Sequence, residues 1–452
     1  MNKKIVILGG GESGVGAAIL AQKKGFDVFL SDNGFIPSIH KHTLNENKIP
    51  FEEGNHSSEM ILDALEVIKS PGIPDDAQLI LQIKEKNIPV ISEIEFAIRY
   101  TKAKIIGITG TNGKTTTTLL THHLLQEAGL NVGLTGNVGF SLAKQVALED
   151  KEYYVVELSS FQLDGMFKSK LHVAVLLNIT PDHLNRYNYD FQNYVTSKFR
   201  IIRNMRKDDF FIFNAGDPAI RTHLEKNQSN VAMLPVSLEK TENRGAWLTD
   251  KYLVFAEGDQ LKKIAKTSLP LRGKHNMINS MAAIQSARSV GVSWEKIQKA
   301  LKTFKNAPHR LEYCGSINEV SFYNDSKATN VDAVWYALES FDVPLVLILG
   351  GVDKGNDYTQ IDELVKKRVK AIVALGIDNT KIIKHFGEYH RDISSVDSIY
   401  TAIEIAHHKA AAGEVVLLSP ACASFDLFKN YEDRGNRFKE AIAALKNKLT
   451  GS

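Results

Sequence analysis

Short apolar runs recur along most of the 452-residue chain, and stretches with helical spacing lie between them. The runs KIVIL (4–8), VAVLL (173–177) and LVLIL (345–349) have the length of buried strands. Strands that alternate with helices are typical of parallel sheets covered by helices. The pattern therefore predicts an α/β protein.

Changes in this pattern divide the chain into sections. Between about 231 and 272 the runs become short and alternate with polar residues, which predicts a small β-rich insertion. Two predicted helices, at 276–290 and near 294–304, follow the insertion. We expect three α/β domains, at 1–93, 94–306 and 307–452, the second of which has a parallel sheet and carries the insertion.

Composition and charge narrow the class of protein. Hydrophobic residues make up 43% of the chain and charged residues 24%, which is ordinary for a globular protein. The net charge is only +3 with Lys and Arg scattered, so we expect no nucleic-acid partner. Two cysteines are too few for a disulfide framework or a zinc cluster. No apolar stretch is long enough to span a membrane, so we expect a cytoplasmic protein without membrane insertion.

The first apolar run leads directly into GGGESGVG, residues 9–16. A strand that enters Gly9-x-Gly11-x-x-Gly14 and leaves as a helix is typical of a turn that binds a diphosphate. Asp32, which ends DVFLSD, has the position of an acidic residue that binds a nucleotide ribose. On these residues alone, the turn also fits an NAD-dependent oxidoreductase.

A second glycine loop, GITGTNGKTTTT at 107–118, lies between a predicted strand and a predicted helix. Lys114 is placed to reach the β- and γ-phosphates of ATP, and the Thr115 hydroxyl is placed to bind Mg²⁺. Residue 108 is Ile, so the strict Walker spacing is not met and a plain tight turn is the alternative. Gly-Lys-Thr in this context favours ATP binding.

Polar residues follow the next predicted strands of the second section. Glu157 ends YYVVE and Asp182-His183 follows VAVLLNIT, so both are expected at the sheet edge where Lys114 lies. A carboxylate there suits a Mg²⁺ contact, although a solvated strand end is an equal alternative. Lys198 lies in the predicted helix QNYVTSKFR, and nothing in its spacing separates it from an ordinary surface lysine.

Several motifs together resemble one family. The loop TGTNGKTT, the strand end VVELSSFQL and NITPDHLNRY are similar to the Mur ligase family. PHRLE (308–312), NDSKATN (324–330), GGVDKG (350–355) and LSPACASFDLFKNYEDRGNRF (418–438) resemble its D-glutamate-adding members. The resemblance extends over essentially the whole chain. It implies a Rossmann-like domain at 1–93, a P-loop ATPase-type domain with a parallel sheet and a small β insertion at 94–306, and a Rossmann-like domain at 307–452. The Asp-Asn-Pro-Arg motif of the diaminopimelate-adding members is absent.

The resemblance implies an ATP-dependent ligase that adds D-glutamate to UDP-N-acetylmuramoyl-L-alanine, a step of peptidoglycan precursor synthesis. The reaction would pass through an acyl phosphate, give ADP and phosphate, and take place on a monomer. Another Mur-type amino-acid ligase or a folylpolyglutamate synthase is the alternative. An NAD oxidoreductase would leave the GTNGKT loop and the third section unexplained.

The resemblance also implies site residues. The N-terminal domain would bind UDP rather than NAD, and the implied UDP-sugar contacts are Ser13, Gly14, Val15, Asp32, Asn33, Ser70, Pro71, Gly72, Asn137, Ser159 and Gln162. The implied ATP contacts are Gly110, Thr111, Asn112, Gly113, Lys114, Thr115, Thr116, Asn276, Arg310 and Asp325. The implied D-glutamate contacts are Thr329, Lys354, Ser424, Phe425 and Tyr431.

Metal binding and catalysis are implied at four positions. Thr115 and Glu157 would bind one Mg²⁺, and His183 would bind a second together with Lys198, carbamylated by CO₂; Mn²⁺ is an alternative metal. This reverses the surface interpretation of Lys198. Lys114, His183 and Lys198 are the implied catalytic residues, and the general base that deprotonates the D-glutamate ammonium stays open between His183 and a bound phosphate.

The residues of the third section agree with an amino-acid site. NDSKATN, GGVDKG and SPACASF each follow a predicted strand, which places all three loops at one sheet edge. Lys354 could neutralise a carboxylate, and the Thr329 and Ser424 hydroxyls could orient it. Taken singly, either hydroxyl would be interpreted as a helix N-cap. Cys422 and His309 are expected to be packed, structural residues.

Overall fold

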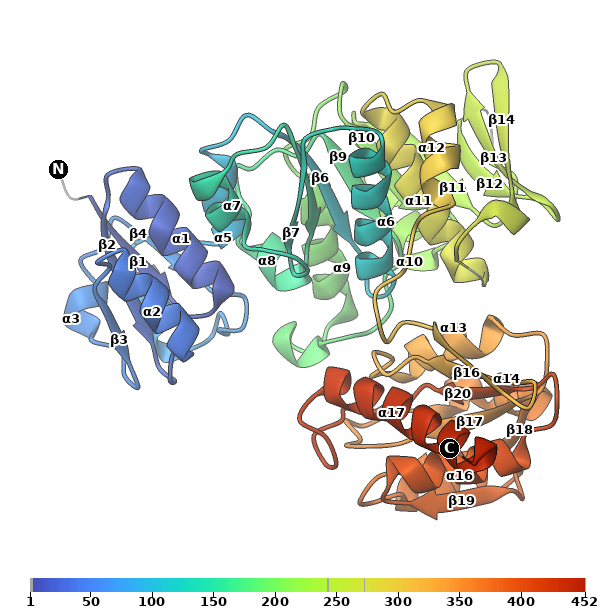
Figure 1. Ribbon diagram of the computed structural model, residues 1–452. Helices are drawn as coiled ribbons and strands as arrows, with labels where there is room; N and C mark the ends of the chain where they lie inside the picture. The colour runs from blue at the N-terminus through green and yellow to red at the C-terminus, as the bar shows by residue number, and fades with distance from the viewer. Residues whose placement is uncertain (1–2, 242–243, 272, 452) are drawn as a thin grey trace. The chain divides into compact units, whose positions relative to one another are not determined.

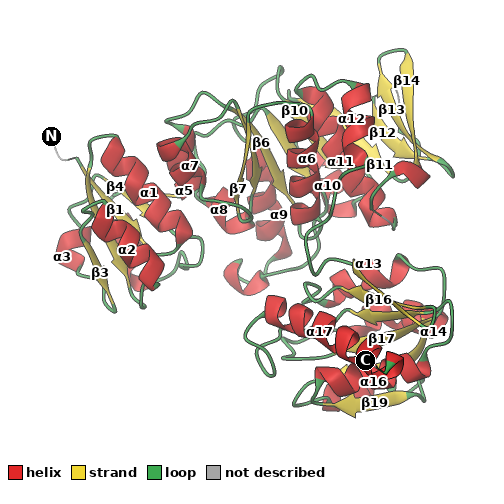
Figure 2. Ribbon diagram, in the orientation of Figure 1, coloured by secondary structure: helices red, strands yellow, loops and turns green. Residues whose placement is uncertain are grey.

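The structure is a computed structural model that describes residues 3–241, 244–271 and 273–451. It forms two compact units, Met1–Pro270 with Met277–Phe304, and Leu271–Asn276 with Lys305–Ser452. In the described part of the chain, three separate sheets carry the fold, and helices flank them (Figures 1 and 2). No helix there combines the length and apolar character that a membrane crossing requires.

The N-terminal sheet of the first unit is parallel, in the order β3-β2-β1-β4-β5. Its strands are β1 Lys4–Leu8, β2 Asp27–Asp32, β3 Phe51–Glu53, β4 Glu66–Lys69 and β5 Val90–Ile91. Its helices are α1 Glu12–Lys23, α2 Ser38–Glu46, α3 Ser58–Ile61, α4 Gln78–Glu85 and α5 Glu93–Ile98. Because β1 lies between β2 and β4, the loops after these three strands leave the sheet side by side at its carboxyl edge.

The central sheet has the order β14-β13-β12-β11-β10-β9-β6-β8-β7 and is parallel from β12 to β7. Its strands are β6 Lys104–Thr109, β7 Val132–Gly136, β8 Tyr153–Glu157, β9 Val173–Leu176, β10 Phe210–Asn214, β11 Ala232–Ser237, β12 Gly245–Leu248, β13 Tyr252–Glu257 and β14 Gln260–Ala265. The predicted β-rich segment is therefore present, and its strands continue the edge of the central sheet (Figure 2).

Helices around the central sheet follow the predicted alternation. They are α6 Lys114–Glu127, α7 Leu142–Leu148, α8 Ser160–Asp164, α9 Phe191–Phe199, α10 Pro218–Lys226, α11 Lys274–Ser289 and α12 Trp294–Leu301, with short 3₁₀ turns η1 Leu184–Arg186, η2 Arg200–Ile202 and η3 Lys266–Ser268. Strand β6 lies between β8 and β9, so the loops that follow these strands meet at one edge.

The second unit contains a sheet of order β15-β16-β20-β17-β18-β19, parallel except for the β15–β16 pair. Its strands are β15 Glu312–Ile317, β16 Val320–Asn324, β17 Leu345–Leu349, β18 Val369–Leu375, β19 Ile393–Val396 and β20 Val415–Leu418. Its helices are α13 Val331–Glu339, η4 Tyr358–Ile361, α14 Asp362–Arg368, α15 Thr380–Phe386, α16 Ile399–Lys409 and α17 Tyr431–Thr450. Four of these strands were predicted, whereas the edge strands β15 and β19 were missed.

A buried carboxylate joins the start of α5 to the start of α7 in the first unit. Glu93 is 4% exposed, and its Oε1 accepts hydrogen bonds from the Ser141 hydroxyl at 2.7 Å and from the Ala143 amide at 2.5 Å. Burial raises the pKa of Glu93 to about 7 in spite of these bonds, and the nearby Glu12 carboxylate adds to the rise. Glu12 in turn pairs with Lys144 at 3.2 Å.

We expect this carboxylate to make the stability of the first unit depend on pH. Between the ordinary glutamate pKa of 4.5 and the folded value of about 7, the folded protein holds the proton that the unfolded chain releases. The free energy of unfolding therefore falls as pH rises through this window, by up to about 3 kcal/mol. Glu93→Gln keeps the hydrogen-bond acceptor and removes the titration, so the variant should gain stability relative to wild type as pH rises.

Urea unfolding of wild type and Glu93→Gln at pH 5 and pH 8 measures this difference. Glu59 is an exposed glutamate of α3, so Glu59→Gln is the matched control. This variant should leave the free energy of unfolding unchanged at both pH values. A wild-type-to-variant difference that is the same at both pH values would contradict the assignment.

Candidate functional site

The glycine turn after β1 contacts the two loops beside it. Gly9 has φ +101°, and a Cβ built there would lie 2.4 Å from the Ser70 hydroxyl. The Gly10 amide donates to Asp32 Oδ2 at 2.6 Å. At Gly11, by contrast, a Cβ would meet nothing within 4 Å, which leaves open space beside the N-terminus of α1. The structure thus brings together the predicted UDP-sugar segments 13–15, 32–33 and 70–72, around a helix start suited to an anion.

The predicted ATP loop is contacted by side chains from neighbouring segments. Gly113 has φ +82°, and a Cβ there would lie 2.5 Å from Asn279 Oδ1 of α11. The Asn112 amide donates to Asn178 Oδ1 at 2.8 Å, and Asn178 Nδ2 donates back to the Asn112 carbonyl at 3.0 Å. The conformation of the loop between β6 and α6 is therefore fixed by residues that follow β9 and by α11, and its role in ATP binding stays a prediction.

Two lysines converge on one carbonyl oxygen of this loop. Lys114 Nζ donates to the Gly110 carbonyl at 2.8 Å and to the Thr111 carbonyl at 2.7 Å. Lys198 Nζ donates to the same Gly110 carbonyl at 2.9 Å and to Thr109 Oγ1 at 3.1 Å. Lys198 is only 2% exposed, so its interpretation from spacing as a surface residue was wrong. Burial and the nearby Lys114 ammonium hold the pKa of Lys198 well below its usual range.

One carboxylate oxygen of Glu157 is available to bind a cation at the same sheet edge. Its side chain is 1% exposed at the end of β8, and Oε1 accepts a hydrogen bond from Asn137 Nδ2 at 2.9 Å. Its other oxygen, Oε2, is buried and has no hydrogen-bond partner among the residues that the structure describes. A buried carboxylate oxygen that nothing satisfies is costly unless a cation or another donor occupies it. The alternative of a solvated strand end was therefore wrong for Glu157.

His183 follows β9 in a strained backbone conformation. It has φ +52°, its side chain is 55% exposed, and its ring lies 5.3 Å from the ring of Phe161. Among the described residues, no cluster of three His, Cys, Asp or Glu side chains could hold a metal. A cation at this edge would therefore need hydroxyl, carboxylate and phosphate oxygens together.

Two predicted UDP-sugar residues form the start of α8. The Gln162 amide donates to Ser159 Oγ at 3.2 Å, and the Ser159 amide donates to Gln162 Oε1 at 2.9 Å. This capping box satisfies both side chains locally. Gln162 is 4% exposed, so the structure gives both residues a local structural role.

In the second unit, the three predicted D-glutamate loops follow β16, β20 and β17, which are adjacent strands. The loop carrying Lys354 is joined to the loop carrying Ser424 through main-chain hydrogen bonds between Val352 and Ala423, at 2.8 and 3.2 Å. The placement of all three loops at one sheet edge is confirmed.

The side chains at this edge differ in exposure. Phe425 is 70% exposed, whereas Ser424 is 2% exposed. The Lys327 ammonium lies 3.6 Å from the centre of the Tyr431 ring. The N-cap of α13 is Asn330, not Thr329, and Ser424 precedes a turn at 425–427 rather than a helix, so the helix-cap alternative was wrong for both residues.

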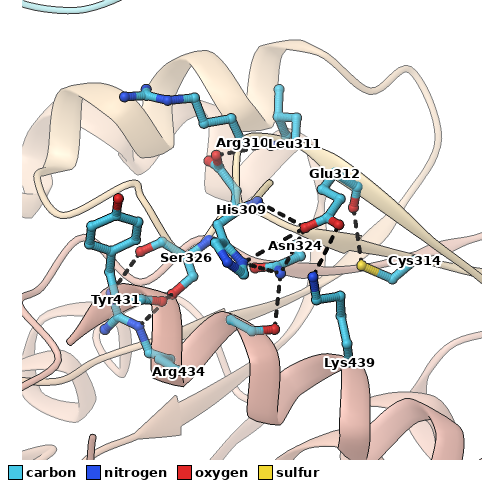
Figure 3. A network of polar contacts seen from close by, with 12 residues as sticks. His309, Arg310, Leu311, Glu312, Cys314, Asn324, Ser326, Tyr431, Arg434 and Lys439 are labelled. Carbon is cyan, nitrogen blue, oxygen red and sulfur yellow. Dashed lines mark hydrogen bonds and ion pairs between the residues drawn. The ribbon is translucent and has the colours of Figure 1, made fainter. Parts of the chain in front are cut away.

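A polar network holds the segment that carries Arg310 (Figure 3). Asn324 Nδ2 lies 2.9 Å from His309 Nδ1 and donates to the Gly435 carbonyl at 3.1 Å. The Lys327 amide donates to the His309 carbonyl at 3.1 Å. His309 is 5% exposed, which confirms its structural role. Arg310 therefore follows directly after His309, a residue whose main chain and side chain are both held by hydrogen bonds.

Asp325 lies beneath the same segment. Its Oδ1 accepts from the Leu311 amide at 3.1 Å and its Oδ2 from the Ser419 hydroxyl at 3.0 Å. Burial raises the pKa of Asp325 to about 7. Asn276, the remaining predicted ATP residue of this unit, is 6% exposed. Burial also raises the pKa of Cys422, which is 1% exposed, as expected of a packed thiol.

Some residues of these sites were not predicted. Asn178 and Asn279 shape the ATP loop, and Tyr194 Oη lies 3.3 Å from Thr111 Oγ1. Asn279 could have been found, because it lies one helical turn after Asn276 in KHNMIN. Asn178 follows β9 as His183 does, but a single asparagine after a strand carries no distinctive signal.

Comparison with known proteins assigns the chain to a family. Family models match residues 3–92 (Mur ligase MurD-like, N-terminal domain), 108–287 (Mur ligase middle domain) and 309–422 (Mur ligase, glutamate ligase domain). The UDP-N-acetylmuramoylalanine–D-glutamate ligase of Cytophaga hutchinsonii is 53% identical over 98% of this chain and 100% of its own. The chain belongs to the Mur ligase family.

Solved structures share the fold of this Mur ligase. The pseudomurein peptide ligase type C of Methanothermus fervidus is 20% identical, with a TM-score of 0.63 over 98% of this chain and 100% of its own. The MurF ligase of Thermotoga maritima, solved with ADP, is 16% identical, with a TM-score of 0.61 over 94% of this chain and 97% of its own. The predicted fold class is confirmed.

Proposed function

We propose that the chain is an ATP-dependent ligase that adds D-glutamate to UDP-N-acetylmuramoyl-L-alanine, in peptidoglycan precursor synthesis. The observation that carries the proposal is the 53% identity, over essentially the full length of both chains, to an enzyme named for this reaction. We further infer that the enzyme acts as a monomer in the cytoplasm and that nucleic acid is not a partner.

The chemistry requires an activated carboxylate, because an amine cannot readily expel oxide from a carboxylate. Transfer of the γ-phosphoryl group of ATP to the L-alanyl carboxylate gives an acyl phosphate and ADP. The D-glutamate amine then attacks the acyl carbon, the C–N bond forms, and phosphate leaves while the amine proton passes to a base. Lys114, at the ATP loop, and Arg310, in the other unit, would each supply a positive charge that offsets the repulsion between the two anions.

Mg²⁺ fits the residues at the central sheet edge. The buried Oε2 of Glu157, at the end of β8, is an oxygen ligand of the kind that Mg²⁺ prefers. Thr115 is the second residue of α6, the helix that follows the adjacent strand β6. These two residues would hold one ion, and His183 with Lys198 would hold a second. Bound there, Mg²⁺ would offset the negative charge of the phosphates.

We infer that Lys198 is carbamylated. The buried amine shares a carbonyl with Lys114, so two ammonium groups there would repel each other. The neutral amine can attack CO₂ and lose a proton, which gives an N–C bond and a carbamate with one negative charge. The carbamate would face Lys114 as an ion pair and offer oxygen to a metal.

Phosphate release with UDP-N-acetylmuramoyl-L-alanine, ATP and Mg²⁺ tests the activity when D-glutamate, L-glutamate, L-alanine and L-lysine are offered separately. Turnover with D-glutamate alone is expected. Turnover with another amino acid instead would move the chain to a sister activity, and no turnover with any of them would contradict the proposal.

A further inference from the structure

The loop after β2, residues 33–37, is held at several points along its backbone. The Gly34 amide donates to Asp32 Oδ1 at 2.7 Å, and the Ile36 amide donates to Glu53 Oε2 at 2.8 Å. The Gly54 amide donates to the Gly34 carbonyl at 3.1 Å. These bonds fix the backbone on both sides of residue 35.

The same loop is packed against the glycine turn. Ile36 is 2% exposed, and a Cβ built at Gly10 would lie 2.6 Å from Ile36 Cγ1. Asp32 connects the two segments, because its carboxylate accepts from the Gly10 amide at 2.6 Å and from the Gly34 amide at 2.7 Å. The position of residue 35 is therefore fixed relative to the turn.

Phe35 is the residue between these contacts, and its ring is in water. It is 89% exposed, the largest exposure among the large hydrophobic side chains of the described residues. The backbone on both sides of Phe35 is held by hydrogen bonds, so the residue is presented at a defined place beside the glycine turn. An exposed aromatic ring there is a surface on which a planar group can stack.

Asp32 is less suited to read the nucleotide directly than its position in the sequence predicted. Each of its carboxylate oxygens already accepts a main-chain hydrogen bond at 2.7 Å or less. Its role here is to join the turn to the loop. The exposed side chains of this loop are Asn33, Phe35 and Pro37, and Phe35 is the only aromatic residue among them.

We propose that the ring of Phe35 is the platform on which the uracil base of the UDP-sugar stacks. This inference rests on the proposed function, which places the diphosphate at the glycine turn, and it identifies the residue that binds the base. Stacking on an aromatic side chain contributes enough to binding that its loss weakens affinity roughly 10- to 100-fold.

Steady-state kinetics of Phe35→Ala and Phe35→Trp test the proposal. We expect Phe35→Ala to raise KM for UDP-N-acetylmuramoyl-L-alanine roughly 10- to 100-fold, with kcat and the KM values for ATP and D-glutamate unchanged. Phe35→Trp should restore the wild-type KM. Ile39→Ala is the matched control, because Ile39 is 67% exposed on the adjoining α2.

An unchanged KM in Phe35→Ala, in an enzyme that turns over normally, would overturn the stacking role and leave the proposed function intact. An inactive wild type would instead count against the proposed function. A change in sedimentation of Phe35→Ala at the assay concentration, with KM unaltered, would assign the ring to contact between copies and would also overturn the proposal.

Fluorescence gives a reading that does not depend on turnover. The indole of Phe35→Trp should be quenched by UMP and by UDP, and not by ribose 5-phosphate, while wild-type fluorescence stays constant with all three. Equal quenching by ribose 5-phosphate would show that the ring does not sense the base, and no quenching by any ligand would place the base elsewhere. Either result would overturn the proposal.

Discussion

Lys198→Ala is expected to lower kcat on the order of 10³-fold, the size of effect that follows removal of one preorganised charge contact. The variant loses the group that would carry the carbamate, and it leaves the Gly110 carbonyl with Lys114 alone. A small carboxylic acid, added to the assay, should enter the vacated space and restore part of the activity. Phosphate release at saturating substrates measures both effects.

The carbamate itself can be observed directly. With ¹³C-labelled CO₂, wild-type protein should show a carbamate carbon resonance that Lys198→Ala lacks. Lys207→Ala, an exposed lysine of the same sheet region, is the matched control and should keep full activity. Full activity in Lys198→Ala, or an identical ¹³C spectrum, would exclude the carbamate role.

Glu157→Gln is expected to cost on the order of 10²-fold in kcat and to raise the Mg²⁺ concentration needed for half-maximal activity. Glutamine has nearly the same shape and can still accept from Asn137 Nδ2, but it has no negative charge. In the variant, an amide nitrogen takes the place of the buried Oε2, and its N–H groups would repel a cation. Activity titrated against Mg²⁺ separates the shift in metal requirement from the loss of rate.

The matched control for Glu157 is another buried carboxylate that is already satisfied. Glu95 is 1% exposed and accepts from the amides of Phe167, Lys168 and Ser169 at 3.0, 3.0 and 2.9 Å. Glu95→Gln should lower stability, because the carboxylate has the better acceptors, without changing the Mg²⁺ requirement. An unchanged Mg²⁺ dependence in Glu157→Gln would contradict the metal role.

The apolar runs predicted most strands because parallel strands buried on both faces contain few polar residues. Strand β17, with all five residues buried, is such a case. The missed strands β15 and β19, at the two edges of their sheet, are mostly half-exposed and carry polar residues. A short edge strand without an apolar run looks like a loop in sequence.

Lys198 was predicted to lie at the surface because its helix neighbours were not considered with it. It lies four residues after Tyr194 in α9, and Tyr194, Val195 and Phe199 are all buried. That spacing places Lys198 on the apolar face of its helix, a signal that was present in the sequence. The domain boundaries near 93 and 306 and the ligand roles of the individual site residues stay predictions.

The contacts around Arg310 could not have been predicted from local pattern. Asn324 and Gly435 are 111 residues apart in sequence and meet through one hydrogen bond. A Cβ at Gly435 would lie 2.1 Å from His309 Nδ1, so this glycine is needed for a close approach that only the folded chain creates. The PHRLE motif identified Arg310, whereas the residues that hold its segment in place are distant in sequence.

The main-chain bridge between Val352 and Ala423 also bears on how selectivity for the amino acid could change during evolution. The two loops it joins cannot separate without breaking two hydrogen bonds. Exchanging side chains of these loops for those of a sister ligase would alter the chemistry of the proposed amino-acid site and keep both main-chain hydrogen bonds. A shift to a bulkier amino acid is therefore expected to involve insertions or deletions in these loops, since such changes can move the backbones that the bridge holds together.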